Sequence, residues 1–210
     1  MLVSNHIGKT AGGTLQFILQ RNYGDNFLGI YSALIKKMFG KERTTPSINP
    51  LDESELNFVL NQYGKIECIS SHFIKFPNSF NNFKTITFLR NPVDRVVSQY
   101  FSLRKKYLGQ KNLPNHMIYD YRYDMRLFFD HWEYVSTQYN VQSRIDNFQT
   151  YVINNANNLD GAVNSLKNEY WFVGITERFD ECLLLLKNQF QKIGIDFNIM
   201  YTSQHVGSYS

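Results

Sequence analysis

The sequence predicts an α/β domain of three layers, in which a central, mostly parallel sheet is flanked by helices. Three short runs, Ile66–Ile69, Lys84–Leu89 and Tyr170–Ile175, have the length and apolar content of buried parallel strands. Segments with apolar side chains at helical spacing stand between them, and this alternation favours a parallel sheet covered on both faces. No repeat or low-complexity linker divides the 210 residues, so we expect one domain over residues 1–210.

Composition and charge exclude several classes of protein. An apolar content of 43%, with 17 Phe and 14 Tyr, excludes a disordered chain. The 22 basic and 18 acidic side chains leave a net charge of +4, which is too small to indicate nucleic acid as a partner. Cys68 and Cys182 lie in apolar runs, so we expect core cysteines rather than a disulfide or a metal site. Because we find no signal-like leader and no apolar run of about 18 residues, we expect a cytoplasmic chain without a membrane span.

The stretch Met1–Tyr23 has the pattern of a strand, a tight loop and a helix. An apolar run opens it, small residues dominate the segment 8–13, and apolar residues resume at helical spacing from Leu15. Such a loop leaves the first backbone N–H groups of the helix without partners inside the helix. Lys9 and the positive end of the helix dipole add to these donors, so the stretch predicts a site for a phosphate or a similar oxyanion.

An ATP or GTP loop is the first candidate for this site, because G-K-T at residues 8–10 matches the end of G-x-x-x-x-G-K-[ST]. Val3 stands where that pattern requires its first Gly. The strand Lys84–Leu89 leads into Arg90 rather than into an Asp that would hold Mg²⁺. An anion loop without metal ligands therefore fits better, and a P-loop-like small-molecule kinase stays as the alternative enzyme.

His72 follows the predicted strand Ile66–Ile69 after two serines. Ligands in open α/β sheets lie beyond the carboxyl ends of the strands. A single histidine in such a place is most often an ordinary loop residue, but imidazole also suits a base that takes a proton from a hydroxyl near neutral pH. The residues alone leave both interpretations open.

A second polar segment, R-N-P at residues 90–92, follows the strand Lys84–Leu89. Pro92 suits the first turn of a helix, and apolar residues then mark one face of that helix. Arg90 stands in the loop and Ser98 lies off the apolar face, so both can bind a ligand, although an exposed Arg and a surface Ser are the ordinary interpretation of an isolated string. The predicted buried face comprises Val93, Val96, Val97, Tyr100 and Phe101.

Further helices are expected to serve as scaffold. One begins near Asp52, ends at Gly64 and follows a segment, Ile30–Met38, with helical character. The last one follows the strand Tyr170–Ile175, and Thr176 is placed to cap it. Its predicted buried side comprises Phe179, Leu183, Leu186 and Phe190.

Residues 6–14, H-I-G-K-T-A-G-G-T, resemble the 5′-phosphosulfate loop of sulfotransferases that use 3′-phosphoadenosine 5′-phosphosulfate (PAPS). The resemblance is to the carbohydrate branch, particularly its uronyl/heparan 2-O-sulfotransferase-like members, whose wording is close to H-I-P-K-T-A-G-T-[ST]. Gly8 replaces a proline and Gly13 a Thr or Ser, which keeps the loop small but loosens it. Residues 90–100 resemble the family's 3′-phosphate motif, R-[DN]-P-x-x-R-x-x-S-x-[YF], and two motifs in the right order are stronger than either alone.

The resemblance implies a P-loop-like sulfotransferase domain that moves the sulfuryl group of PAPS to a hydroxyl acceptor, such as a carbohydrate, and releases PAP. It implies that Arg90 and Ser98 bind the 3′-phosphate, that His72 is the general base, and that no metal is required. Lys9 would also take part in catalysis by offsetting charge on the departing phosphate. The implied 5′-phosphosulfate ligands are Lys9, Thr10, Ala11, Gly12, Gly13 and Thr14.

Other segments are less specific. The basic and aromatic stretch 102–132 suits an acceptor surface or ordinary packing, and N-V-Q-S-R at residues 140–144 resembles a family string in which Gln142 or Arg144 could face the acceptor. Ser203 and Gly207 stand where relatives close a loop over the adenine. The sequence ends before the helix that follows in relatives, so we expect a C-terminal end that is trimmed or naturally short. A catalytically inactive nucleotide-binding module is the non-enzyme alternative, and the acceptor and the oligomeric state stay open.

Overall fold

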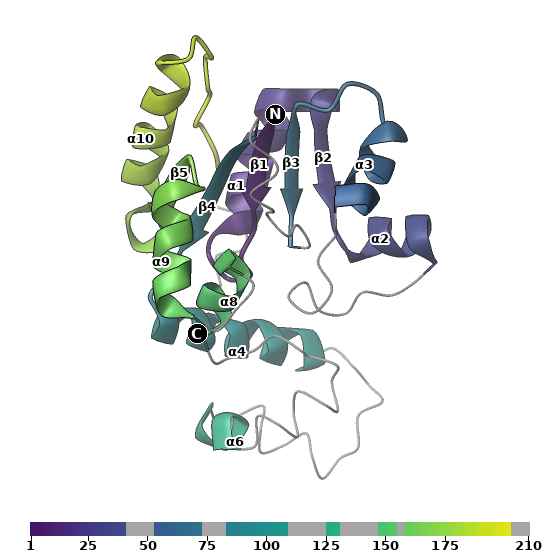
Figure 1. Cartoon of the computed structure of the whole chain (residues 1–210). Coiled ribbons are helices and arrows are strands. Elements are labelled where there is room, and N and C mark those ends of the chain that lie inside the picture. Colours follow the sequence, from purple (N-terminus) through teal and green to yellow (C-terminus); the bar gives the residue numbers. More distant parts are fainter. Residues whose placement is uncertain (41–52, 73–82, 109–124, 131–146, 155–157, 203–210) are drawn as a thin grey trace.

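The computed structural model describes residues 1–40, 53–72, 83–108, 125–130, 147–154 and 158–202. Its described part contains a sheet of five parallel strands in the order β2-β3-β1-β4-β5, drawn in Figure 1. The prediction of an α/β domain with a mostly parallel sheet is therefore confirmed. The strands are β1 (Leu2–Asn5), β2 (Phe27–Ile30), β3 (Cys68–Ser71), β4 (Lys84–Leu89) and β5 (Phe172–Ile175).

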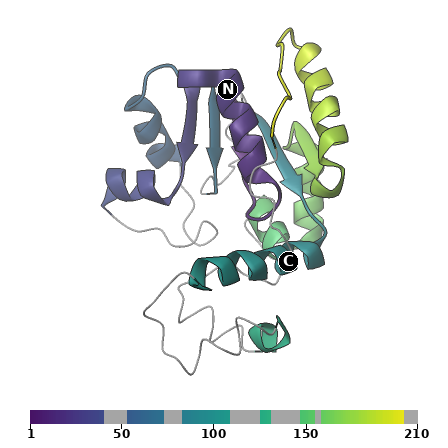
Figure 2. The same cartoon turned by 180° about the vertical axis from the view of Figure 1, so that it is seen from behind.

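Helices cover both faces of the sheet. Successive strand residues point to opposite faces, and apolar residues of β1 point to both of them. Leu2 packs with buried side chains of α1 (Gly12–Tyr23) and α10 (Phe179–Gln191). Val3 packs on the other face, against α3 (Glu53–Asn61). Figure 2 shows α1 in front of the sheet, whereas Figure 1 shows α3 and α9 (Leu159–Asn168) on the opposite side. The three layers expected from the sequence are present.

The end of the sheet to which the strands point is bordered by further helices. In Figure 1, α4 (Pro92–Leu108) and α8 (Phe148–Asn154) lie beyond the carboxyl ends of the strands. None of the helices in the described ranges is both long enough and apolar enough to cross a membrane. The remaining elements are η1 (Gly24–Asn26), α2 (Ser32–Phe39), α6 (Met125–Asp130) and η2 (Thr176–Arg178).

Strand boundaries differ from the predictions in ways that follow from pairing. Lys84–Leu89 is a strand as predicted, but the run Ile66–Ile69 is two residues too early, since Leu2 of β1 pairs with Cys68. The strand predicted from Tyr170 begins at Phe172, whose partner is Ile86 of β4. β2 was not predicted: a run of four residues with a central glycine carries little strand signal.

The buried face of α4 is partly different from the predicted one. Val93 is 69% exposed, whereas Arg95 is only 2% exposed. The Asn91 side chain accepts a hydrogen bond from the Val93 N–H at 2.9 Å, and the helix begins with Val93 turned to solvent. Arg95 lies over the ring of Phe148 in α8, 4.6 Å from its centroid, and burial lowers the pKa of the guanidinium to about 10. Packing against α8 therefore determines which face of α4 is buried.

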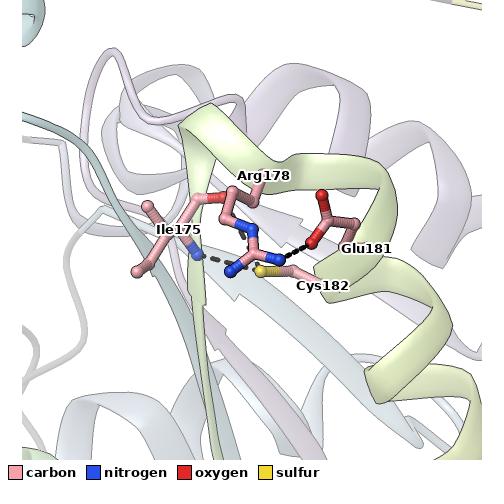
Figure 3. Close-up of polar contacts among 4 residues, drawn as sticks. All are labelled: Ile175, Arg178, Glu181 and Cys182. Atoms are coloured by element: carbon pink, nitrogen blue, oxygen red, sulfur yellow. Dashed lines mark hydrogen bonds and ion pairs between the residues drawn. The ribbon is translucent and has the colours of Figure 1, made fainter.

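Thr176 does not cap α10, which corrects the prediction. Its hydroxyl donates to the Leu89 carbonyl at 2.9 Å, and η2 separates it from the start of α10 at Phe179. At this turn Arg178 forms an ion pair with Glu181, and the Ile175 N–H donates to Cys182 Sγ at 3.3 Å (Figure 3). The predicted buried residues Leu183, Leu186 and Phe190 are buried, and Cys68 and Cys182 are buried free thiols as expected.

Candidate active site

The loop between β1 and α1 makes a tight turn in which two residues adopt left-handed backbone conformations. Lys9 has φ 71° and Ala11, the residue before α1, has φ 60°. The Thr10 hydroxyl donates to the Ile7 carbonyl at 2.8 Å and closes the turn. The helix ladder begins with Leu15 N–H donating to the Ala11 carbonyl at 3.1 Å, so the N–H groups of Gly12 and Gly13 precede it. This is the backbone arrangement of an anion cradle at a helix N-terminus.

Arg90 is brought against this loop from β4. Its guanidinium Nη1 donates to the Lys9 carbonyl at 3.3 Å. Gln149 of α8 holds the Arg90 backbone from both sides, with Oε1 accepting from its N–H at 2.9 Å and Nε2 donating to its carbonyl at 2.7 Å. Burial and the neighbouring Arg90 lower the pKa of Lys9. Two cations thus face one another beside the N-terminus of α1.

His72 lies next to His6 because their strands are neighbours in the sheet. Asn5 of β1 pairs with Ser71 of β3, and the His6 N–H donates to the Ser71 carbonyl at 2.9 Å. His72 Nδ1 hydrogen-bonds the His6 carbonyl, and the two ring centroids are 4.0 Å apart. Because a carbonyl only accepts, Nδ1 of His72 carries the hydrogen and Nε2 keeps its lone pair.

Burial disfavours the charged form of both imidazoles. Burial lowers the pKa of His72 despite its bond to the His6 carbonyl. The pKa of His6 lies well below its usual value of 6.5, first because the ring is buried and then because His72 and Lys9 are cations when charged. With Nδ1 bonded to the His6 carbonyl, Nε2 of His72 is the ring nitrogen that can accept a proton.

Some of the predicted site residues lie close together in the structure and others do not. Residues 9–14, Arg90 and His72 surround the carboxyl ends of β1, β3 and β4. Ser98 lies in the second turn of α4 and is partly buried. Most of the basic and aromatic stretch lies outside the described residues, as do Gln142, Arg144, Ser203 and Gly207.

Three contributors were not predicted. Gln149 clamps Arg90, and the Tyr31 hydroxyl bonds His6 Nδ1 at 3.1 Å. His6 was predicted only as the first residue of the loop motif, with no role of its own. Gln149 and Tyr31 carry no local signal, because each acts through a partner more than twenty positions away in the sequence. His6 could have been found as the first residue after a buried strand beside the predicted base.

The comparison with known families agrees with this geometry. A family model described as Sulfotransferase family matches residues 1–191, from β1 to the end of α10. No curated protein matches the sequence. The match covers nearly the whole chain and includes the loop, Arg90 and His72, so the chain belongs to the sulfotransferase family.

Proposed function

We propose that the protein transfers the sulfuryl group of PAPS to a hydroxyl of a carbohydrate acceptor, with His72 as the general base. The observation that carries this proposal is the 3.3 Å contact between the Arg90 guanidinium and the Lys9 carbonyl. It joins two motif segments that are 81 positions apart in the sequence. The loop after β1, the Arg90 guanidinium and the His72 imidazole thereby stand at the ends of three neighbouring strands, which supports an anionic donor beside a base.

The charge arrangement supports a donor with several negative groups. Arg90 and Lys9 repel one another, which is one cause of the lowered pKa of Lys9. An anion bound between two cations turns that repulsion into attraction. We propose that residues 9–14 hold the 5′-phosphosulfate with backbone N–H groups and Lys9, and that Arg90 and Ser98 bind the 3′-phosphate.

The hydrogen-bonded His72 supplies the base for an in-line transfer. Its Nε2 takes the acceptor hydroxyl proton while the acceptor oxygen forms a bond to sulfur. The bond between sulfur and the 5′-phosphate oxygen breaks, and the electron pair leaves with that oxygen as PAP. Lys9 and the N–H groups of Gly12 and Gly13 offset the charge that grows on the departing oxygen.

The carbohydrate acceptor is proposed from the resemblance of the loop and of residues 90–100 to the carbohydrate branch. Most of the segments expected to bind it, including Gln142 and Arg144, lie outside the described residues. A cytoplasmic location is likewise a proposal, and the buried free thiols of Cys68 and Cys182 are compatible with a reducing compartment.

The donor assignment is tested by isothermal titration with PAP and with AMP, which lacks the 3′-phosphate. Arg90→Ala is expected to weaken PAP binding about 10- to 100-fold, the range for a lost charge-assisted bond, and AMP binding by less than about threefold. Arg178→Ala is the matched control, since Arg178 is an exposed cation paired with Glu181. Equal losses for PAP and AMP would contradict the 3′-phosphate assignment.

The chemistry is tested with labelled PAPS and chemically desulfated heparin oligosaccharides, with products read by mass. Transfer that survives EDTA is expected, and His72→Gln should lower kcat by about 10²- to 10⁴-fold. Turnover of ATP that requires Mg²⁺ would support a kinase instead. Tight PAP binding without transfer to any hydroxyl, in the parent and in His72→Gln alike, would support the inactive module.

A further inference from the structure

His6 occupies a place between the donor loop and the proposed base. It is the first residue after β1, and its ring is 4.0 Å from the ring of His72 by centroids, with a tilt of 34°. Tyr31, the first residue after β2, stands edge-on to both rings, at 5.9 Å from His6 and 5.1 Å from His72. Three ring side chains from three adjacent strand ends therefore pack together.

Hydrogen bonds fix the orientation of the His6 ring. His6 Nδ1 bonds the Tyr31 hydroxyl at 3.1 Å, and that hydroxyl bonds Ser70 Oγ at 2.9 Å. Ser70 is buried in β3, two positions before His72. The chain of bonds that starts at His6 thus ends on the strand that leads to His72, whose own ring is bonded to the His6 carbonyl.

The other side of the His6 ring rests on the backbone of the donor loop. A Cβ atom added to Gly12 would lie 1.7 Å from His6 Nε2 and 1.8 Å from its Cδ2. The ring therefore lies against the first residue of α1, whose N–H belongs to the proposed anion cradle. One imidazole contacts both the donor loop and the base.

We propose that His6 is a positioning residue for sulfuryl transfer, whose imidazole sets the distance and angle between the donor loop and His72. This inference rests on the proposed function, in which His72 is the base. His6 does not itself accept the proton. Among the described residues, the titratable groups that face it are His72, Lys9 and Tyr31, and none of these is a carboxylate that would stabilise a charged His6.

His6→Asn is the variant that separates positioning from folding. The Asn amide can still bond the Tyr31 hydroxyl, but the ring between Gly12 and His72 is gone and water can reach His72. Tyr31→Phe removes only the hydroxyl and keeps all rings. The primary readout is the pH titration of the His72 imidazole signal by NMR, identified by its loss in His72→Gln and recorded without any acceptor.

In His6→Asn the titration midpoint of His72 is expected to rise by at least about half a pH unit toward its ordinary value, because the ring is less buried. The acid limb of the kcat profile should move with it, and kcat should fall about tenfold or more. PAP affinity should change less than about twofold, since His6 donates nothing to the anion cradle. Tyr31→Phe should change the His72 midpoint and kcat in the same directions as His6→Asn does, but by smaller amounts.

An unchanged His72 titration in both variants would overturn the proposal. So would a PAP affinity that weakens in parallel with kcat, because His6 would then serve only the loop. Failure of the proposed function looks different: PAPS turnover would be absent in the parent protein, or unaffected by His72→Gln, whereas the NMR titration would still report whether His6 controls His72.

Discussion

One methyl group added at Gly12 should disturb both the stability of the protein and the geometry of the site. The Cβ of Gly12→Ala would lie 1.7, 1.8 and 2.5 Å from three atoms of the His6 ring. Non-bonded heavy atoms essentially never lie within 3.0 Å of a Cβ atom, so the ring has to move by roughly 1.3 Å or the helix start has to shift. The ring has little freedom to move, because His72 packs on it and Tyr31 bonds its Nδ1.

Overpacking of this kind costs about 1–3 kcal/mol of unfolding free energy. For a chain of this length, each kcal/mol corresponds to about 2–4 °C in Tm, so a loss of about 2–12 °C is expected. Displacing His6 also displaces His72, and a shift of about 1 Å in a reacting group can lower kcat about 100-fold. Thermal unfolding and turnover of labelled PAPS measure the two effects.

Gly8→Ala is the matched control in the same loop. A Cβ at Gly8 meets nothing within 4 Å, and its φ is not in the left-handed region. Its unfolding free energy should stay within about 0.5 kcal/mol of the parent. If Gly12→Ala and Gly8→Ala have the same Tm and the same turnover, the packing of His6 on α1 is wrong.

Three further predictions concern pH and backbone geometry. Burial lowers the folded-state pKa of His6 and His72 below 6.5, so the unfolded chain binds protons first as the pH falls. Tm should therefore be highest above about pH 6.5 and drop below it. A flat Tm from pH 8 to 5 would contradict this. Asn91→Ala should cost about 1 kcal/mol in urea unfolding through loss of the bond to Val93 N–H, whereas Asn91→Asp should retain the cap. Ala11→Gly removes the Cβ of a residue held in a left-handed conformation at φ 60°. Although glycine also gives the unfolded chain more conformational entropy, the unfolding free energy should rise by up to about 1 kcal/mol. A fall in the unfolding free energy would show that the conformational cost of this φ is already offset.

Local features of the fold could be predicted from the order of the amino acids alone. Apolar runs of strand length predicted the central strands, and small residues followed by helical spacing predicted the loop and α1. These features depend on neighbours a few positions apart, which a sequence displays directly. Residues 9–14 and Arg90 were predicted as PAPS-binding residues from the resemblance of their two segments to sulfotransferase motifs, and their binding of PAPS stays a prediction.

Contacts between groups that are distant in the sequence became visible only in the folded molecule. The strand order places β3 and β4 on either side of β1, and this brings His72 to the His6 carbonyl and Arg90 to the Lys9 carbonyl. Packing against α8 buries Arg95 and leaves Val93 exposed, contrary to the helical pattern of α4. Local spacing does not encode these contacts, because each depends on which surface a second element presents after the sheet has assembled.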